Sequence, residues 1–253
     1  MPDMRILPRI EVFHVLAGPL WDKVPAIVFG DALIPWEILD ETPVPGGKGK
    51  LQLARRGDEY VIRVDGKDLM SSRTHDSEKA LADLTCGRVT RSDARVLVGG
   101  LGMGFTLAAA LAGLPAKASV VLAELVHGVI VWNQGILGPL AGDPLKDSRV
   151  TVYEGDVRDL IKKPEDGFDA ILLDVDNGPD GLTQESNSWL YQSMGLNAAM
   201  KALRKGGVLA VWSAFDAPWF TQRLRDAGFI VEVEMVRAHG NKGTRHTIWL
   251  AFK

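Results

Sequence analysis

The stretch that decides the fold is RVLVGGLGMGFTLAAAL, residues 95–111. A short apolar run comes first, a cluster of glycines follows, and an alanine- and leucine-rich helical pattern begins at once. This order predicts a buried strand, a tight turn and the start of a helix. Glycine permits left-handed backbone angles and close approach of a ligand, and free N–H groups at a helix start favour an anion or a polar group. A glycine-rich turn alone is weak evidence for a ligand, so its meaning depends on the strands around it.

From residue 94 onward the sequence alternates between strand-like and helix-like segments. The expected strands are apolar and cover residues 95–99, 118–124, 149–155, 168–174 and 206–212. The expected helices cover residues 105–113, 127–137, 157–163, 189–204 and 216–227. Five such β-α units predict a parallel sheet with helices on both faces. Two further strands, 228–236 and 245–253, are joined by HGNKG without room for a helix, so they must pair antiparallel.

The first part of the chain has a different pattern, rich in proline and in short alternating stretches. We expect strands or extended pieces at 10–16, 26–30 and 34–39, a loop at 42–50, and a β-hairpin over 50–70 with turns at 56–58 and 65–66. The segment 77–86 predicts a helix capped by Asp76 or Ser77. These patterns divide the chain into an N-terminal β-rich domain, residues 1–76, and an α/β domain, residues 77–253, in which 77–93 is a linking helix.

Composition narrows the function classes. The chain has 253 residues, of which 46% are apolar and 24% charged, as in ordinary globular proteins. A net charge of −3 gives no electrostatic reason to expect a nucleic acid or an anionic membrane as partner. The apolar runs are too short to span a bilayer, and the N-terminus lacks the pattern of a signal peptide. With one cysteine, Cys86, no internal disulfide is possible, and a reducing cytoplasm is the simplest location.

Carboxylates follow the expected strands at the edge where an open α/β sheet binds its ligand. The second strand ends at Glu124, about two dozen residues after the glycines, where a ribose diol would find its acceptor. The third is followed by Asp156, and the fourth ends at Asp174. Each has a purely structural alternative: a solvated strand end for Glu124, a helix cap for Asp156, and a turn for Asp174. Taken together, glycine or a carboxylate at four successive strand ends favours a shared binding crevice.

Residues 94–253 look like a class I S-adenosylmethionine-dependent transferase, and the whole chain resembles the spermidine synthase (polyamine aminopropyltransferase) family. VDG at 64–66, VLVGGLGMG at 96–104, Glu124, EGD at 154–156 and FDAILLD at 168–174 fall in that family's order. The resemblance implies a doubly wound, mostly parallel seven-stranded α/β sheet of the methyltransferase-type Rossmann-like kind, with a small N-terminal β-rich domain. It also implies a homodimer, since family members commonly pair through the N-terminal domain.

The resemblance also implies roles for individual residues. Glu124 would bind the ribose, Asp156 the adenine amino group, and Asp174 would accept the proton of the attacking amine. The full expected cofactor set is Gly99, Gly100, Gly102, Gly104, Glu124, Asp156 and Val157. Asp176 is a second candidate for catalysis, and Trp189 and Tyr191 are candidates for a substrate wall, with core packing as the alternative.

Three departures from the family pattern bear on the substrate. The family's glycine loop usually reads GGGDG, with an Asp that meets the amine of decarboxylated S-adenosylmethionine, whereas GGLGMG has no acid. After the fourth strand the family has a second Asp and a Pro where this chain has Asn177 and Gly178. The family's polyamine-gripping Tyr-His-Glu is missing from the comparable stretch, DSEKALADL.

These departures from the family pattern set the order in which the candidate functions are ranked. The first expectation is a transferase that uses S-adenosylmethionine itself, most simply for methyl transfer to a small amine-like acceptor. The alternatives are an aminopropyltransferase that uses decarboxylated S-adenosylmethionine, and a non-catalytic nucleoside-binding or dimerisation module. No metal is expected, because the five histidines lack metal-ligand spacing, and we expect His246 to be solvated at the start of the last strand.

Overall fold

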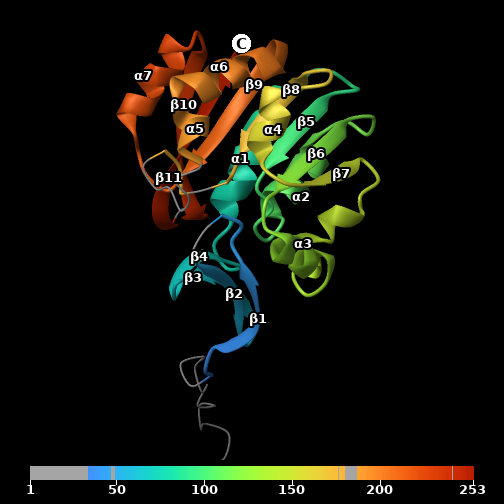
Figure 1. The fold of residues 1–253 in the computed structure, drawn as a ribbon, viewed down its shortest axis with the longest axis vertical. Coiled ribbons are helices and arrows are strands. Elements are labelled where there is room, and N and C mark those ends of the chain that lie inside the picture. The colour runs from blue at the N-terminus through green and yellow to red at the C-terminus, as the bar shows by residue number, and fades with distance from the viewer. Residues whose placement is uncertain (1–33, 47–48, 176, 180–186, 241) are drawn as a thin grey trace, which may run out of the picture. The chain divides into compact units, whose positions relative to one another are not determined.

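The computed structural model describes residues 34–46, 49–175, 177–179, 187–240 and 242–253. Within these ranges the chain forms two β-sheets, and Figure 1 shows the helices packed against the larger one. The strands expected at 10–16 and 26–30 lie outside the described residues.

The smaller sheet has four antiparallel strands in sequence order. They are β1 (Glu37–Pro43), β2 (Lys50–Arg56), β3 (Glu59–Val64) and β4 (Lys67–Ser71). The hairpin predicted over residues 50–70 is confirmed, with positive φ at Gly57, Asp65 and Gly66 in its two turns. The strand expected at 34–39 instead covers Glu37–Pro43, because its pairing with β2 continues as far as Pro43 opposite Lys50.

The larger sheet has seven strands in the order β10-β11-β9-β8-β5-β6-β7. They are β5 (Arg95–Gly99), β6 (Ser119–Glu124), β7 (Val150–Glu154), β8 (Phe168–Leu173), β9 (Leu203–Ser213), β10 (Ile230–His239) and β11 (Lys242–Phe252). The strands β5 to β9 pair in parallel, whereas β11 runs antiparallel to β9 and to β10. The predicted doubly wound, mostly parallel seven-stranded sheet is therefore confirmed.

Helices cover both faces of this sheet (Figure 1). One core contains residues of α1 (Asp76–Cys86), α2 (Phe105–Gly113) and α3 (His127–Gln134), and the other contains residues of α4 (Val157–Lys162), α5 (Ser188–Tyr191), α6 (Ser193–Ala202) and α7 (Pro218–Asp226). Successive strand side chains point to opposite faces, so Val96 and Val98 join the first core and Leu97 the second. Two 3-10 turns, η3 (Gly138–Ala141) and η4 (Pro144–Lys146), follow α3. None of the helices in the described ranges is long and apolar enough to cross a bilayer.

Two expected helices differ in detail. The helix expected at 189–204 is broken after Tyr191, because Gln192 is extended with ψ 162° before α6 begins. The first helix begins at Asp76 with His75 as its N-cap residue, and no side chain caps it. The predicted cap is wrong because the Asp76 carboxylate accepts the Gly240 N–H at 2.6 Å, and the Ser77 hydroxyl donates to a carboxylate described below.

The two sheets share a core. Leu51, Leu53 and Ile62 of the smaller sheet belong to the same buried cluster as the helices α1, α2 and α3. The indole N–H of Trp132 in α3 donates to the Asp40 carboxylate of β1 at 2.7 Å. Both sheets lie within one compact unit, Pro35–Lys253, and a domain boundary between residues 76 and 77 stays a prediction.

Candidate functional site

The glycine turn lies between β5 and α2. Gly100, Gly102 and Gly104 have positive φ values of 91°, 51° and 84°, and Gly104 is the N-cap residue of α2. A Cβ atom at Gly100 would lie 2.1 Å from the main-chain oxygen of Asp174. Because no side chain fits there, only glycine lets the ends of β5 and β8 approach so closely.

This turn is also the point where the chain order of the sheet reverses. On one side the Gly100 N–H donates to the Ala123 carbonyl of β6, and on the other the Asp174 N–H donates to the Gly99 carbonyl, both at 2.9 Å. Since β6 lies on one side of β5 and β8 on the other, the switch point of the sheet is at the end of β5, at Gly99 and Gly100. Open α/β sheets bind their ligands at this kind of switch point.

Gly102 accepts a hydrogen bond from Asn133 and lies close to the side chain of Met70. The amide of Asn133 in α3 donates to the Gly102 carbonyl at 2.8 Å and to the Val129 carbonyl at 2.9 Å. A Cβ atom at Gly102 would lie 2.8 Å from the sulfur of Met70 in β4. Met70 therefore occupies space that an acidic side chain at this position of the loop would need.

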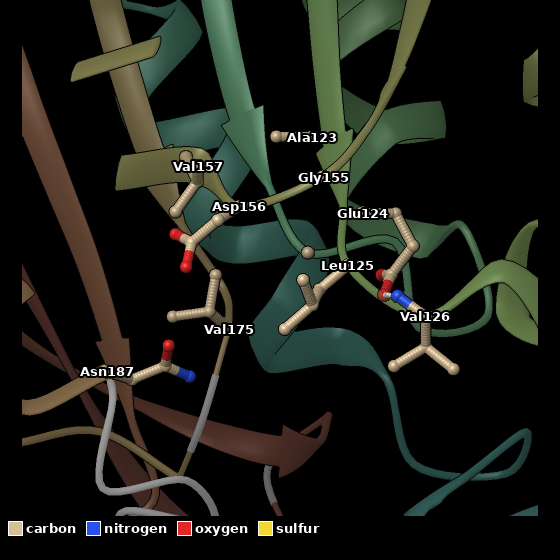
Figure 2. Close-up of a pocket in the computed structure, with 10 residues that line it drawn as sticks. Ala123, Glu124, Leu125, Val126, Gly155, Asp156, Val157, Val175 and Asn187 are labelled. Carbon is tan, nitrogen blue, oxygen red and sulfur yellow. Dashed lines mark hydrogen bonds between the residues drawn. The ribbon is translucent and has the colours of Figure 1, made fainter. Parts of the chain in front are cut away.

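Glu124 ties the end of β6 to the glycine turn. Its carboxylate accepts the N–H groups of Leu101 and Val126, each at 2.8 Å, and Figure 2 shows the second of these bonds. The side chain is buried, which raises the pKa of Glu124, and the main-chain donors offset this only in part. The carboxylate orients the turn and also lines the pocket beside it.

Asp156 begins α4 as its N-cap residue. One carboxylate oxygen accepts the Arg158 N–H at 2.8 Å, and the other accepts the Arg158 side-chain Nε–H at 2.7 Å. Burial alone would raise the pKa of Asp156, but the hydrogen bonds and charge of Arg158 outweigh it, so the pKa is lowered. Asp156 is therefore an ionised acceptor at neutral pH, and it caps the helix in the way that its structural alternative predicted.

A pocket lies between the ends of β6, β7 and β8. Its lining consists of Gly100, Ala123, Glu124, Leu125, Val126, Gly155, Asp156, Val157, Val175 and Asn187. Figure 2 shows the side chains of Asp156, Val175 and Asn187 on one side of the pocket and Glu124 on the other. Of the expected cofactor set, Gly100, Glu124, Asp156 and Val157 thus come together, while Gly99, Gly102 and Gly104 lie in the adjoining turn without lining the pocket.

The two aromatic residues expected at a substrate wall do not line this pocket. Tyr191 is 2% exposed and packs edge-on against Phe220 with ring centroids 5.7 Å apart. Trp189 is partly buried, with the Lys162 ammonium 4.8 Å from its ring centroid. These contacts favour the packing alternative for both residues, and Asn187, which the sequence analysis did not single out, lines the pocket instead.

Asp174 follows β8 and faces α2. Its carboxylate accepts the hydroxyl proton of Thr106 at 2.6 Å. Burial raises the pKa of Asp174 to about 6, although the hydrogen bond from Thr106 lowers it. The second catalytic candidate, Asp176, lies outside the described residues.

A further carboxyl, Glu78 of α1, was missed by the sequence analysis. Glu78 is 8% exposed and accepts the Ser77 hydroxyl proton at 2.6 Å. Burial, together with the nearby charge of Asp174, raises the pKa of Glu78 to about 7, even though the hydrogen bond from Ser77 lowers it. The available signal was position: Glu78 lies on the same helix face as the buried Leu81 and Ala82, where a carboxyl is unusual.

Two further kinds of chemistry, metal binding and a cysteine nucleophile, find no support in the described residues. Across the described ranges, no group of three or more histidine, cysteine, aspartate or glutamate side chains is placed to hold a metal ion. Cys86 is buried, and burial raises the pKa of its thiol to about 12, so it is not a nucleophile at neutral pH.

A turn of positive-φ glycines at a switch point, followed by acids at the next strand ends, is what the family resemblance implies. A model of the spermine/spermidine synthase domain matches residues 78–227, which is more than half of the chain. The chain belongs to the spermine/spermidine synthase family. Membership confirms the expected enzyme class, a transferase that uses S-adenosylmethionine or its decarboxylated form, and speaks against the non-catalytic alternative.

Solved structures show the same fold. A spermidine synthase in complex with the transition-state analogue AdoDATO is 19% identical, with a TM-score of 0.66 over 85% of this chain and 72% of that one. The spermidine synthase from Thermotoga maritima is 18% identical, with a TM-score of 0.67 over the same shares of the two chains. A search of curated protein sequences finds no match. The family assignment favours aminopropyl transfer, which the sequence analysis ranked second, over methyl transfer, which it ranked first.

Proposed function

We propose that this chain transfers an aminopropyl group from decarboxylated S-adenosylmethionine to a small amine. The observation that carries the proposal is a pair of carboxyls, partly buried Asp174 and buried Glu78, beside the glycine turn in a chain of this family. One solved relative is a spermidine synthase bound to the transition-state analogue AdoDATO, and its fold over 85% of this chain supports the same type of reaction here.

The charges around the crevice suit cationic substrates. Decarboxylated S-adenosylmethionine carries a sulfonium and an ammonium group and no carboxylate, and an amine acceptor is also a cation in solution. Among the described residues that line the pocket, two are acidic and none is basic. Asp174 and Glu78 add two further carboxyls near the turn. Opposite charges attract more strongly in a partly buried site than in water, so this set favours the decarboxylated donor over one that carries a carboxylate.

The residues fit an adenosyl group in the following way. The glycine turn would lie against the sulfonium tail, because Gly100 lines the pocket and has no side chain there. Glu124 would accept hydrogen bonds from the ribose diol with the lone pairs that Leu101 and Val126 leave free. Asp156 would accept a hydrogen bond from the adenine amino group.

Asp174 is the base in this proposal. When bound, the donor supplies an electrophilic carbon on a sulfonium, which leaves as a neutral thioether. The acceptor amine must be unprotonated at attack and loses a proton as its bond to carbon forms. The Thr106 hydroxyl holds the Asp174 carboxylate in place, and a pKa of about 6 brings this base close to the pH at which it works. Asp174 thus orients the amine and takes its proton.

Methyl transfer from intact S-adenosylmethionine is the second candidate, and one observation favours it. The loop position where the family has an acid is Gly102, and Met70 occupies the space beside it. A donor that keeps its carboxylate does not need that acid, and the N–H groups at the start of α2 would suit the carboxylate.

The two candidates give different products. The protein would be incubated with decarboxylated S-adenosylmethionine and a panel of diamines, and separately with S-adenosylmethionine and the same amines. Aminopropyl transfer releases methylthioadenosine in the first arm, whereas methyl transfer releases S-adenosylhomocysteine in the second. Turnover confined to the second arm would refute the proposal, and Asp174→Asn, which removes the base, serves as the control for chemistry on the protein.

A further inference from the structure

A buried row of polar groups leads from β11 to the acid pair. The Nδ1 atom of His246 lies 2.8 Å from the hydroxyl of Ser77, and that hydroxyl lies 2.6 Å from a carboxylate oxygen of Glu78. The last member, Glu78, is near Asp174, because the Thr106 hydroxyl oxygen lies 2.6 Å from a carboxylate oxygen of Asp174 and 3.4 Å from the main-chain carbonyl of Glu78. The sequence predicts a solvated His246, and this prediction is wrong, because the His246 side chain is half-buried and its Nδ1 contacts Ser77 of α1.

The hydrogen bonds in this row have one direction. While Glu78 is ionised its carboxylate can only accept, so the single hydroxyl proton of Ser77 goes to Glu78 and the Ser77 oxygen accepts from its other neighbour. Nδ1 of His246 is therefore the protonated ring nitrogen. Burial lowers the pKa of His246, so at neutral pH the ring is an uncharged donor. Its contribution to Glu78 is therefore one of geometry and hydrogen bonding.

Packing fixes the imidazole ring in this orientation. The ring of His246 meets the Trp212 indole of β9 edge-on, with centroids 4.8 Å apart and planes at 75°. Ser77 itself is fully buried. His246 cannot rotate without losing its contact with Trp212 or its hydrogen bond to Ser77. The Ser77 hydroxyl is therefore held in the orientation that donates to Glu78.

The other acid of the pair is fixed by a different hydroxyl. Thr106 in α2 donates to Asp174 at 2.6 Å, and its oxygen lies 3.4 Å from the main-chain carbonyl of Glu78. One hydroxyl from α1 and one from α2 thus hold the two carboxyls in neighbouring positions. Further groups around Glu78 are Asp76 in its own helix and His239 of β10, which lies 3.6 Å from Asp76.

We propose that His246 is a positioning residue which, through Ser77, holds Glu78 beside Asp174 so that the two carboxyls act as one proton acceptor for the amine. This inference rests on the proposed function for its catalytic consequence, although the geometry can be tested without turnover. The pair takes up one proton when the amine loses it, and one negative charge remains on the two carboxyl groups beside Thr106. His246 touches neither substrate nor reacting atoms.

Loss of the His246 donor is expected to change the pKa of Glu78 in one direction. Without it the Ser77 hydroxyl is free to rotate toward other acceptors, and Glu78 loses the hydrogen bond that lowers its pKa. The pKa of Glu78 then rises further. The pair is fully ionised only at higher pH, so the acid limb of the pH profile for kcat/KM moves to higher pH by roughly half a unit or more.

The experiment compares four variants with the unchanged chain. His246→Leu removes the donor, His246→Asn keeps a donor at the position of Nδ1, and Ser77→Ala breaks the row at its middle. His239→Asn is the matched control, because His239 also lies against α1 but is exposed. The titration of the Glu78 carboxyl is followed by carbon-13 NMR and assigned with Glu78→Gln, and the pH dependence of methylthioadenosine release is measured in parallel.

We expect His246→Leu and Ser77→Ala to shift both the Glu78 titration and the acid limb to higher pH, while His246→Asn and His239→Asn leave them in place. If folded His246→Leu and Ser77→Ala titrate like the unchanged chain, His246 is a packing residue and the inference is overturned. Should His246→Leu fail to fold, His246→Phe, which keeps an aromatic ring against Trp212 but has no donor, takes its place. A protein without turnover would refute the proposed function alone, since the NMR titration still tests the row.

Discussion

A substitution at Gly100 tests whether the close approach of the neighbouring strands β5 and β8 requires glycine at this position. We expect Gly100→Ala to destabilise the protein through two separate effects. The first is backbone strain, since an L-residue at φ 91° costs about 1–2 kcal/mol. The second is a collision, because the new Cβ would lie 2.1 Å from the Asp174 main-chain oxygen, and contacts below 3.0 Å force something to move. Overpacking of this kind costs about 1–3 kcal/mol.

Gly206 supplies the matched control, because it has a φ of 77° and a Cβ added there would have no atom within 4 Å. Gly206→Ala therefore carries the strain without the collision. For a chain of this size, 1 kcal/mol corresponds to about 2–4 °C in Tm, so Gly100→Ala should melt about 2–12 °C below Gly206→Ala. The assay is calorimetric melting of both variants, followed by titration with the adenosyl donor.

The collision also falls on the segment that carries the base. Moving the Asp174 main chain by about 1 Å would misplace its carboxylate, and such a displacement costs on the order of 100-fold in rate. We therefore expect Gly100→Ala to lose transfer activity, whereas Gly206→Ala keeps it. Equal melting temperatures and equal activities of the two variants would show that a side chain fits between the ends of β5 and β8. The predicted collision would then be refuted.

Three further predictions concern the carboxyls. Asp174→Asn should lower kcat by about 10²–10⁴-fold, with donor affinity by calorimetry nearly unchanged; full activity would exclude Asp174 as the base. Glu124→Ala leaves the buried N–H groups of Leu101 and Val126 without their acceptor, so urea unfolding should show a loss of about 2–4 kcal/mol, and Glu124→Gln, which keeps an acceptor, should lose less. Stability should also fall as the pH rises from about 4.5 to 7, because Glu78 with a pKa of about 7 holds a proton in the folded state that the unfolded chain has already released. Urea unfolding at about pH 5 and pH 8 should show Glu78→Gln losing on the order of 2 kcal/mol less than the unchanged chain, and equal losses would contradict the assignment.

The sequence determined the layers of the larger sheet. Uniformly apolar strand segments such as 170–173 face a helix layer on each side, and the two-residue repeat of a strand sends Leu172 to one core and Leu173 to the other. The glycine turn and the acids at the strand ends could also be predicted, because a turn, a strand end and a helix start are each encoded within a few residues. Local sequence therefore brought Glu124, Asp156 and Asp174 to one edge.

Helix boundaries and caps were less predictable, because a distant group can compete for a capping side chain. Asp76 was a reasonable N-cap in sequence, yet its carboxylate binds the N–H of Gly240, 164 residues away. The sequence alone is also compatible with either a substrate-pocket wall or core packing for Tyr191 and Trp189. Their contacts with α7 and α4 favour packing.

Only the tertiary structure decided which side chains meet the acids. Ser77 and His246 are 169 residues apart, and they touch because β11 inserts between β9 and β10, which brings the start of α1 against the last strand. Asn133 reaches the carbonyl of Gly102 for a similar reason, since α3 packs beside the turn. Periodicity fixes the face on which a residue lies, but strand order fixes its neighbours, and strand order depends on the whole chain folding at once.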